Sequence, residues 1–197
     1  MMVELMIPYE FNAERFSRWM AYVLRHNPER YGLQHDRHGY VDLGEFLRVA
    51  KHRYPDLSVE RLQQLIESVG TSRFEVAGSQ VRARYGHSIP AEPVGPPVEP
   101  PPILYYGIEA SQAESVLTQG LLPVSRRSLH LSLTKEEALA IAKRKTGQPA
   151  VLRVMAQDAH RSGIAFYRES TLYLVSQIPL PFLSLEPHDE AEVTAGN

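Results

Sequence analysis

The clearest alternation of apolar and polar positions along the chain lies between residues 12 and 28. Its apolar residues recur at the spacing i, i+3, i+4, i+7 and i+8, which predicts a helix with one buried face: Phe16, Trp19, Met20, Val23 and Leu24. Asn12 is a suitable N-cap, and Asn27-Pro28 ends the helix because a residue before proline disfavours the α conformation. Arg25 points away from the apolar stripe, so packing does not require it, and His26 lies at the margin of the stripe.

Arg25 and His26 place a permanent cation and a titratable imidazole side by side at the end of this helix. Such a pair can bind an anion. A helix end with these residues is more often a solvated terminus, where the helix dipole favours positive charge. The choice between the two interpretations depends on what else the chain carries.

Two more helices and a hairpin are predicted in residues 42–88. The second helix begins at Asp42, with Glu45 at capping-box spacing, and the third begins at Ser58 and ends at Gly70. The residues that these two helices should bury are Leu43, Phe46, Leu47, Ala50, Leu62, Leu65, Ile66 and Val69. Strands are expected at 73–76 and 81–85, and three helices followed by a hairpin indicate a winged helix.

The second strand of this hairpin carries two arginines on one face. Alternation places Arg82 and Arg84 together, with apolar and aromatic side chains on the opposite face. His87 and Ser88 follow directly after Gly86. This face is either a solvated edge or a basic binding surface.

Residues 89–102 contain seven prolines and predict a semi-rigid linker. Beyond the linker the pattern changes to short strands, at 103–106, 129–133, 151–155, 164–167 and 172–175. Helices are expected at 113–119 and from a capping box at 134–137. We therefore predict domains at 12–88 and 103–186, the second an α+β lobe on largely antiparallel sheet, and a disordered tail at 187–197.

Composition narrows the function without deciding it. The 197 residues are 43% hydrophobic with a formal net charge of −2, so a polyanion would have to be met by a local cluster of Arg and His. The absence of cysteine excludes disulfides and thiol nucleophiles and fits a reducing compartment, so we expect a cytoplasmic protein. Neither a membrane span nor a signal peptide is expected, and the eight histidines lack the carboxylate-rich spacing of a metal site.

Short motifs follow one another along both halves of the chain. In the first half they are Leu24-Arg25-His26, Tyr31-Gly32-Leu33, Asp36 with Gly39-Tyr40-Val41, Arg73-Phe74, Val81-Arg82-Ala83 and Gly86-His87-Ser88. In the second half they are Leu104-Tyr105-Tyr106-Gly107, Gly120-Leu121, His130-Leu131-Ser132, Arg144 before Pro149, and Tyr173-Leu174-Val175. In this order they resemble the RNA 2′-phosphotransferases of the KptA type, and the resemblance runs from residue 16 to about residue 186.

The resemblance implies an α+β protein with an N-terminal winged-helix lobe for RNA and a C-terminal ADP-ribosyltransferase-like lobe of mixed or antiparallel β structure for NAD. It implies that an internal RNA 2′-phosphate attacks C1″ of the nicotinamide ribose and releases nicotinamide. The ribose O2″ then attacks the phosphate of the ADP-ribosylated RNA, which gives 2′-hydroxyl RNA and ADP-ribose 1″,2″-cyclic phosphate. NAD is a co-substrate and no metal takes part; we expect a monomer.

The same resemblance assigns residues to the reaction. The family's essential Arg-His-Arg-Arg set is matched by Arg25, His26, Arg82 and Arg144. Guanidinium groups suit a dianionic phosphate because they are permanently charged and bidentate, and His26 could assist O2″ as a general base or through a hydrogen bond. The residues implied for NAD are Tyr105, Tyr106, Gly107, His130 and Ser132, and those implied for RNA are Arg84, His87 and Ser88.

Three positions depart from the family pattern, where Gln, His and Thr are usual: Tyr85, Tyr106 and Ile108. The stretch around Arg144 is one residue longer than the common spacing, so Lys143 and Lys145 remain alternatives to it.

Two other functions stay open. One is an ADP-ribosyltransferase that stops after the first step and modifies terminal phosphates of nucleic acids. The other is a winged-helix regulator with a ligand-sensing second domain. The regulator is disfavoured because the exposed face of the third helix is not basic; it carries Glu60, Arg61, Gln63, Gln64 and Glu67.

Overall fold

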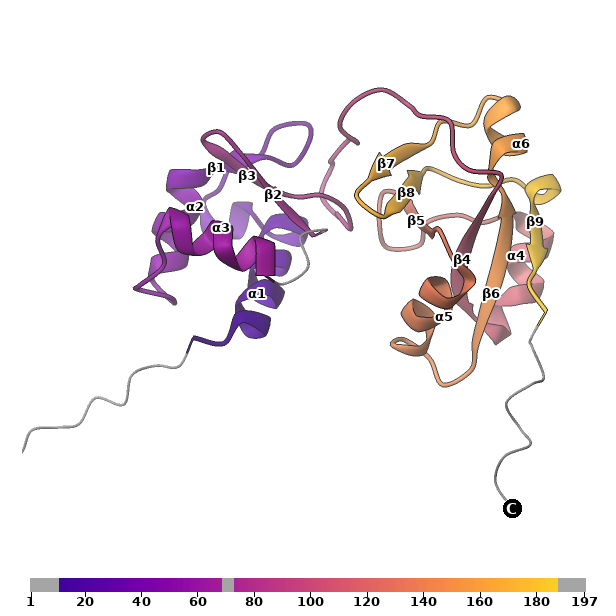
Figure 1. Cartoon of the computed structure of the whole chain (residues 1–197), viewed down its shortest axis with the longest axis horizontal. Helices are drawn as coiled ribbons and strands as arrows, with labels where there is room; N and C mark the ends of the chain where they lie inside the picture. Colours follow the sequence, from indigo (N-terminus) through magenta and orange to yellow (C-terminus); the bar gives the residue numbers. More distant parts are fainter. Residues whose placement is uncertain (1–10, 69–72, 188–197) are drawn as a thin grey trace, which may run out of the picture. The chain divides into compact units, whose positions relative to one another are not determined.

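The structure, a computed structural model, describes residues 11–68 and 73–187 (Figure 1). The chain divides into two compact units between Ala91 and Glu92, and each unit has its own hydrophobic core. The proline-rich stretch is bound to unit 2 from Val98 onward, where the Val98 N–H donates to the carbonyl oxygen of Phe166 at 2.7 Å.

Unit 1 begins with helices that start where local capping predicts. They are α1 (Ala13–His26), a 3-10 turn (Glu29–Tyr31), α2 (Leu43–Lys51) and α3 (Val59–Ser68). The side chains of Asn12, Asp42 and Ser58 each accept a hydrogen bond from the backbone N–H three residues on, at 2.8, 2.9 and 3.2 Å. These bonds satisfy N–H groups that have no partner inside the helix, and the predicted helix starts are confirmed.

The apolar stripes of these helices form the core of unit 1. All residues predicted to be buried on the first two helices are buried, as is Leu62 on α3, whereas Leu65 and Ile66 are partly buried. The predicted end of the third helix at Gly70 and the burial of Val69 lie outside the described residues.

An antiparallel three-stranded sheet completes unit 1. Its strands are β1 (Val41–Asp42), β2 (Phe74–Ala77) and β3 (Gln80–Ala83), in the order β1-β3-β2. The hairpin is confirmed with bounds shifted by one or two residues, but β1 was not predicted, because two residues are too short to show alternation. β1 makes β3 the central strand, and Arg82 is only 2% exposed, so the interpretation of its face as a solvated edge is wrong.

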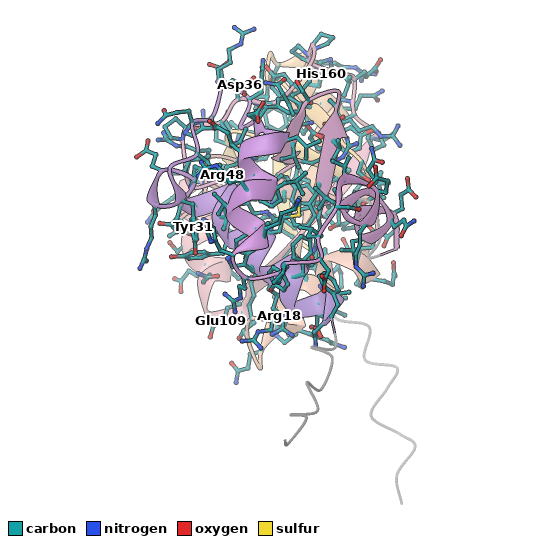
Figure 2. All side chains as sticks on the ribbon, turned by 90° about the vertical axis from the view of Figure 1, so that its left-hand side faces the viewer. Arg18, Tyr31, Asp36, Arg48, Glu109 and His160 are labelled. Carbon is teal, nitrogen blue, oxygen red and sulfur yellow. The ribbon has the colours of Figure 1, made fainter. Side chains whose placement is uncertain are left out.

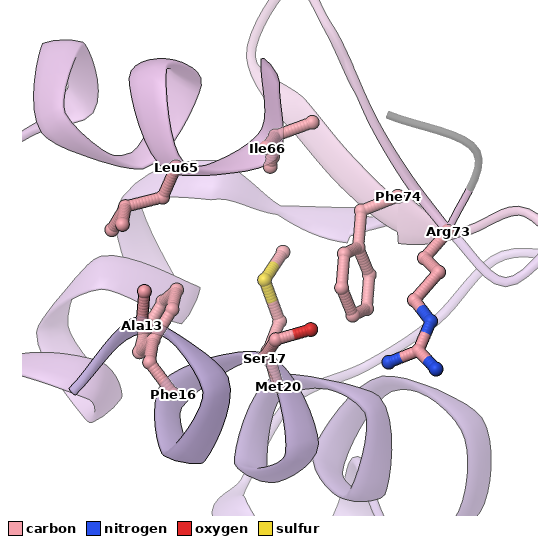
Figure 3. A pocket seen from close by; sticks show the side chains of 8 residues that line it. All are labelled: Ala13, Phe16, Ser17, Met20, Leu65, Ile66, Arg73 and Phe74. Atoms are coloured by element: carbon pink, nitrogen blue, oxygen red, sulfur yellow. The ribbon is translucent and has the colours of Figure 1, made fainter. Parts of the chain in front are cut away.

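Between α1, α3 and β2 lies an apolar hollow (Figure 3). It is lined by Ala13, Phe16, Ser17, Met20, Leu65, Ile66, Arg73 and Phe74. Among the described residues that line it, the polar side-chain groups are one hydroxyl and one guanidinium, which are too few to orient a charged substrate. The candidate chemistry of unit 1 therefore lies elsewhere, on the far ends of α1 and β3.

Unit 2 is an antiparallel six-stranded sheet with three short helices. The strands are β4 (Ile103–Glu109), β5 (Leu129–Ser132), β6 (Pro149–Met155), β7 (Tyr167–Glu169), β8 (Leu172–Val175) and β9 (Leu183–Leu185), in the order β7-β8-β5-β4-β6-β9. The helices are α4 (Ala113–Gln119), α5 (Lys135–Lys143) and α6 (Ala156–Arg161). The α+β class with antiparallel sheet is thus confirmed, while β9 and α6 were not predicted.

One predicted strand of unit 2 is wrong. Residues 164–166 make no ladder, and β7 begins only at Tyr167. The apolar alternation of this segment correctly reports burial, since Phe166 is fully enclosed. Ladder pairing is set instead by the turn at Ser170, whose φ of 57° aligns Glu169 with Leu172.

The two faces of this sheet have different coverings. Leu104 and Ile108 of β4 face the hydrophobic core of unit 2. The opposite face of β4 carries Gly107, and α5 lies so close to it that a Cβ there would be 2.3 Å from the carbonyl oxygen of Ala138 (Figure 1). Over the described parts of the chain, every helix is too short or too polar to cross a membrane.

Candidate functional site

Basic side chains of unit 1 gather where the end of α1 meets the loop after β3. The backbone N–H of Ser88 donates to the carbonyl oxygen of Arg25 at 3.0 Å, and His26 Nδ1 lies 2.9 Å from Ser88 Oγ. The bond to Nδ1 fixes the orientation of the His26 ring and directs Nε2 away from Ser88. Ser88, which the sequence assigned to RNA, therefore also holds His26.

Arg25 is half-buried and packs against aromatic rings of the hairpin. Its Cζ lies 5.1 Å from the ring centroid of Tyr85 and 5.9 Å from that of Phe74. Gly86 has φ +88°, and a Cβ there would lie 3.2 Å from Arg25 Nη1. The helical wheel did not predict this packing, because the covering rings come from residues about fifty positions further along the chain.

Arg82 lies in the interior of the same unit and is paired with a carboxylate. Its Nε donates to Glu75 Oε2 at 2.8 Å, and its Cζ is 5.0 Å from the ring centroid of Tyr40. Arg84, on the same strand face, has Nη2 3.5 Å from Glu75 Oε1. Sequence reasoning missed Glu75 and Tyr40; the turn Gly78-Ser79, which fixes the register of the hairpin, was the signal that could have revealed Glu75.

His87 is buried beside these cations and stays neutral. Burial, followed by the charges of Arg25 and Arg82, lowers the pKa of His87 from its ordinary 6.5 to about 4. Gly39, with φ +79°, allows this ring to approach, since a Cβ there would be 2.9 Å from His87 Nε2. His87 can therefore donate or accept a hydrogen bond at neutral pH, but it adds no positive charge.

The neutral His87 makes the stability of unit 1 depend on pH. The unfolded His87 binds a proton below about pH 6.5, whereas the folded one binds it only below about pH 4, so folding is disfavoured as pH falls through this window. Between pH 6.5 and pH 4 the unfolding free energy of the wild type should fall by on the order of 3 kcal/mol because of His87. The His87→Gln variant lacks this titrating group and should not show that loss. Urea titrations of both proteins at several pH values measure the difference, and a difference curve that is flat over this window would contradict the assignment.

Residues of unit 2 that the sequence assigned to NAD mostly share one sheet face. Tyr105 and Ser132 are directly opposite in the β4–β5 pair, so their side chains share a face, and Gly107 and His130, two residues away on each strand, share it too. This is the face that α5 covers. Tyr106 lies on the other face and packs against the core, where burial raises the pKa of its hydroxyl.

Three basic side chains lie near this face of unit 2. Arg126 Nη1 is 2.9 Å from His130 Nδ1. Partial burial, followed by the charge of Arg126, lowers the pKa of Lys145. Within residues 11–68 and 73–187, no carboxylate forms an ion pair with Arg126 or Lys145. Two neighbouring cations without a carboxylate favour an anionic ligand.

The geometry of α5 distinguishes Lys145 from Arg144. Ala138 and Ala142 form the helix face that meets Gly107. The Lys145 N–H donates to the carbonyl oxygen of Ala142 at 2.8 Å, so the helical path continues to Lys145 and the spacing 138, 142, 145 keeps this residue on the same face. Arg144, the C-cap residue of α5, is two residues after Ala142 and lies on a different side of this path, although Arg144 and Lys145 are both exposed.

Within the part of the chain that the structure describes, no group of three or more His, Asp or Glu side chains is arranged to hold a metal ion. The arrangement instead offers fixed guanidinium groups, one oriented imidazole and a sheet face with basic side chains, which suit binding and transfer of phosphate.

Comparisons with known proteins agree with this chemistry. The family model described as "RNA 2'-phosphotransferase, Tpt1 / KptA family" matches residues 12–177. The chain is 35% identical to the probable RNA 2′-phosphotransferase 1 of Archaeoglobus fulgidus over 181 residues, which are 91% of this chain and 83% of that protein. It is 36% identical to the probable RNA 2′-phosphotransferase of Lacticaseibacillus paracasei over 171 residues, which are 86% of this chain and 91% of that protein. It is 34% identical to the probable RNA 2′-phosphotransferase of Agrobacterium fabrum over 179 residues, which are 89% of this chain and 96% of that protein.

Proposed function

The chain belongs to the Tpt1/KptA family of RNA 2′-phosphotransferases, and from this premise we propose that it removes an internal 2′-phosphate from RNA by transferring it to ADP-ribose supplied by NAD. In this proposal unit 1 is a winged-helix lobe that binds the RNA and unit 2 is an ADP-ribosyltransferase-like lobe that binds NAD. The observation that carries the proposal is that Arg25, His26 and Arg82, three groups of unit 1 suited to one phosphate, surround the buried His87 closely enough for their charges to act on it.

Unit 1 would bind and orient the phosphate. Arg25 and Arg82 are held by aromatic rings and, for Arg82, by a carboxylate, so both guanidinium groups are fixed before a ligand arrives. Fixed cations stabilise charge that develops on phosphoryl oxygens without the cost of reorganising. His26 would meet the ribose hydroxyl through Nε2, because Ser88 occupies Nδ1. Arg84 and His87 would contact the RNA beside the phosphate.

Unit 2 fits NAD, whose bond between C1″ and nicotinamide supplies the electrophile. Gly107 lies on the face that also carries Tyr105 and Ser132, where it lets α5 pack closely against β4, and its backbone would meet the carboxamide from the strand itself. Arg126 and His130 on the same face suit the diphosphate. Tyr106 lies on the opposite face of β4, where it would support the strand that forms the wall of the NAD site. Ile108 is buried in the core of unit 2, which accounts for an apolar residue at a position where the family usually has Thr.

The fourth cation of the reaction is either Arg144 or Lys145. The family resemblance favours Arg144, whereas the face of α5 favours Lys145. We expect Lys145→Ala to lower the transfer rate by about two orders of magnitude and Arg144→Ala and Lys143→Ala by less than about threefold. Single-turnover rates of the three variants, each folded by circular dichroism, decide between them. A large loss at Arg144 with none at Lys145 would restore the assignment from the resemblance.

The proposed function is tested by release of nicotinamide. Protein and NAD are incubated with a short RNA that carries one internal 2′-phosphate, or with the same RNA carrying a 2′-hydroxyl. We expect stoichiometric release of nicotinamide with the phosphorylated RNA alone. Equal release with both RNAs would indicate hydrolysis of NAD, and no release with either would overturn the proposal.

A further inference from the structure

Glu75 accepts hydrogen bonds from Arg82 and Tyr40 and forms an ion pair with Arg84. It lies opposite Arg82 in the register of β2 and β3. Its Oε2 accepts the Nε–H of Arg82 at 2.8 Å and the hydroxyl of Tyr40 at 3.0 Å, while Oε1 lies 3.5 Å from Arg84 Nη2. Burial acts to raise the pKa of Glu75, but the hydrogen bond and charge of Arg82, with the charge of Arg84, outweigh it and lower that pKa, so the carboxylate is ionised at neutral pH.

Glu75 and Tyr40 restrict the guanidinium of Arg82 in two directions. The Glu75 carboxylate binds the Nε edge of the planar guanidinium group of Arg82. The Tyr40 ring lies against the face of that group, with 5.0 Å between Arg82 Cζ and the ring centroid. Burial raises the pKa of Tyr40, so its hydroxyl keeps the proton that it donates to Glu75. The Arg82 side chain is 3% exposed, so solvent does not compete for these positions. A rigid planar group that is fixed at an edge and a face points its other N–H groups in one direction.

We propose that Glu75 is a positioning residue, which together with Tyr40 orients Arg82 toward the 2′-phosphate of the RNA. The proposal rests on the proposed function, because it assumes that Arg82 binds this phosphate. Its alternative is that Glu75 only neutralises charge. As a negative group beside the site, a purely neutralising Glu75 would weaken phosphate binding, and its removal would strengthen that binding. If Glu75 orients Arg82, its removal should instead weaken phosphate binding.

The test compares binding of two RNAs without NAD, so that no turnover occurs. One short RNA carries a single internal 2′-phosphate and the other carries the 2′-hydroxyl. The ratio of their dissociation constants isolates the contribution of the phosphate from general attraction to RNA. We expect Glu75→Ala to reduce the preference for the phosphorylated RNA by about ten- to a hundredfold, the loss commonly seen when a residue that orients a binding group is removed. Glu75→Gln keeps an oxygen acceptor for Arg82 and Tyr40, and should retain the ratio within about fivefold.

Matched variants separate orientation from charge and from folding. Glu14→Ala removes a carboxylate that pairs with Arg18 at the surface of the same unit, and should leave the ratio unchanged (Figure 2). If Glu75→Ala does not fold because Arg82 loses its buried partner, Tyr40→Phe takes its place; this variant keeps the ring and removes one bond to Glu75, and should lower the ratio about fivefold.

Each outcome of this experiment has a definite meaning. A wild-type ratio near one overturns the proposed phosphate recognition, and the role of Glu75 with it. A high wild-type ratio that Glu75→Ala or Tyr40→Phe leaves unchanged overturns the role of Glu75 alone. A higher ratio in both Glu75→Ala and Glu75→Gln would assign Glu75 to charge neutralisation and overturn positioning.

Discussion

Arg25→Ala is expected to lower the rate of phosphate transfer by about two to three orders of magnitude, the loss commonly seen when one fixed donor to a developing anion is removed. Arg25 is held at the end of α1 by Tyr85, by Phe74 and by close approach to Gly86, so its guanidinium is oriented before RNA binds. The stability cost should be only about 1 kcal/mol, because the lost packing is a half-buried cation against rings. Single-turnover rates and urea titrations measure the two effects separately.

Two variants serve as controls for Arg25→Ala. Arg18→Ala, on the same helix, removes an exposed arginine whose side chain is 71% accessible and pairs with Glu14, and it should leave the rate unchanged (Figure 2). Arg25→Lys keeps the charge but loses the planar fork, so it should recover little of the rate. A folded Arg25→Ala protein with the wild-type rate would remove Arg25 from the site.

Gly107→Ala is expected to destabilise unit 2 by about 3 kcal/mol or more, at the upper end for an overpacked interior. The added Cβ would lie 2.3 Å from the carbonyl oxygen of Ala138 and 2.9 Å from the Cβ of Ala142. Both neighbours belong to the inner face of α5, so relief requires the helix to move away from β4. We expect faster hydrogen exchange of the amides in α5 and β4, together with loss of the transfer reaction.

Gly147→Ala is the matched control for Gly107→Ala. Gly147 follows α5 in the same unit, and a Cβ there would have no atom within 4 Å. Its substitution should change the unfolding free energy by less than about 0.5 kcal/mol. Trp19 is the single tryptophan of the chain and lies in unit 1, so its fluorescence follows unit 1 separately. Wild-type exchange of α5 in Gly107→Ala would show that α5 tolerates a side chain there.

The sequence predicts those features that local chemistry decides. Asn12, Asp42 and Thr134 begin helices because each side chain can reach an N–H three residues away, and the structure contains all three bonds. The apolar stripe of α1 likewise marks the core of unit 1. Both features involve residues within a few positions of each other, so one sequence is sufficient to find them.

Features that depend on distant pairing could not be predicted in the same way. Nothing at Glu75 itself indicates a partner for Arg82, because the pair follows from the register of the hairpin. The ring that lies against Arg82 belongs to Tyr40, more than forty residues earlier in the chain. The proximity of Lys145 to Arg126 depends on α5 packing on Gly107. The family resemblance therefore named the candidate site residues, whereas the residues that hold them in place became visible only in the fold.

The most direct test of the central claim follows the phosphate itself. A short RNA is labelled at one internal 2′-phosphate and incubated with the protein, with and without NAD. We predict that the label moves to ADP-ribose cyclic phosphate only when NAD is present, leaving RNA with a 2′-hydroxyl. Label that accumulates in ADP-ribosylated RNA would indicate an enzyme that performs the first step alone. Label that stays on unmodified RNA under both conditions would contradict the account.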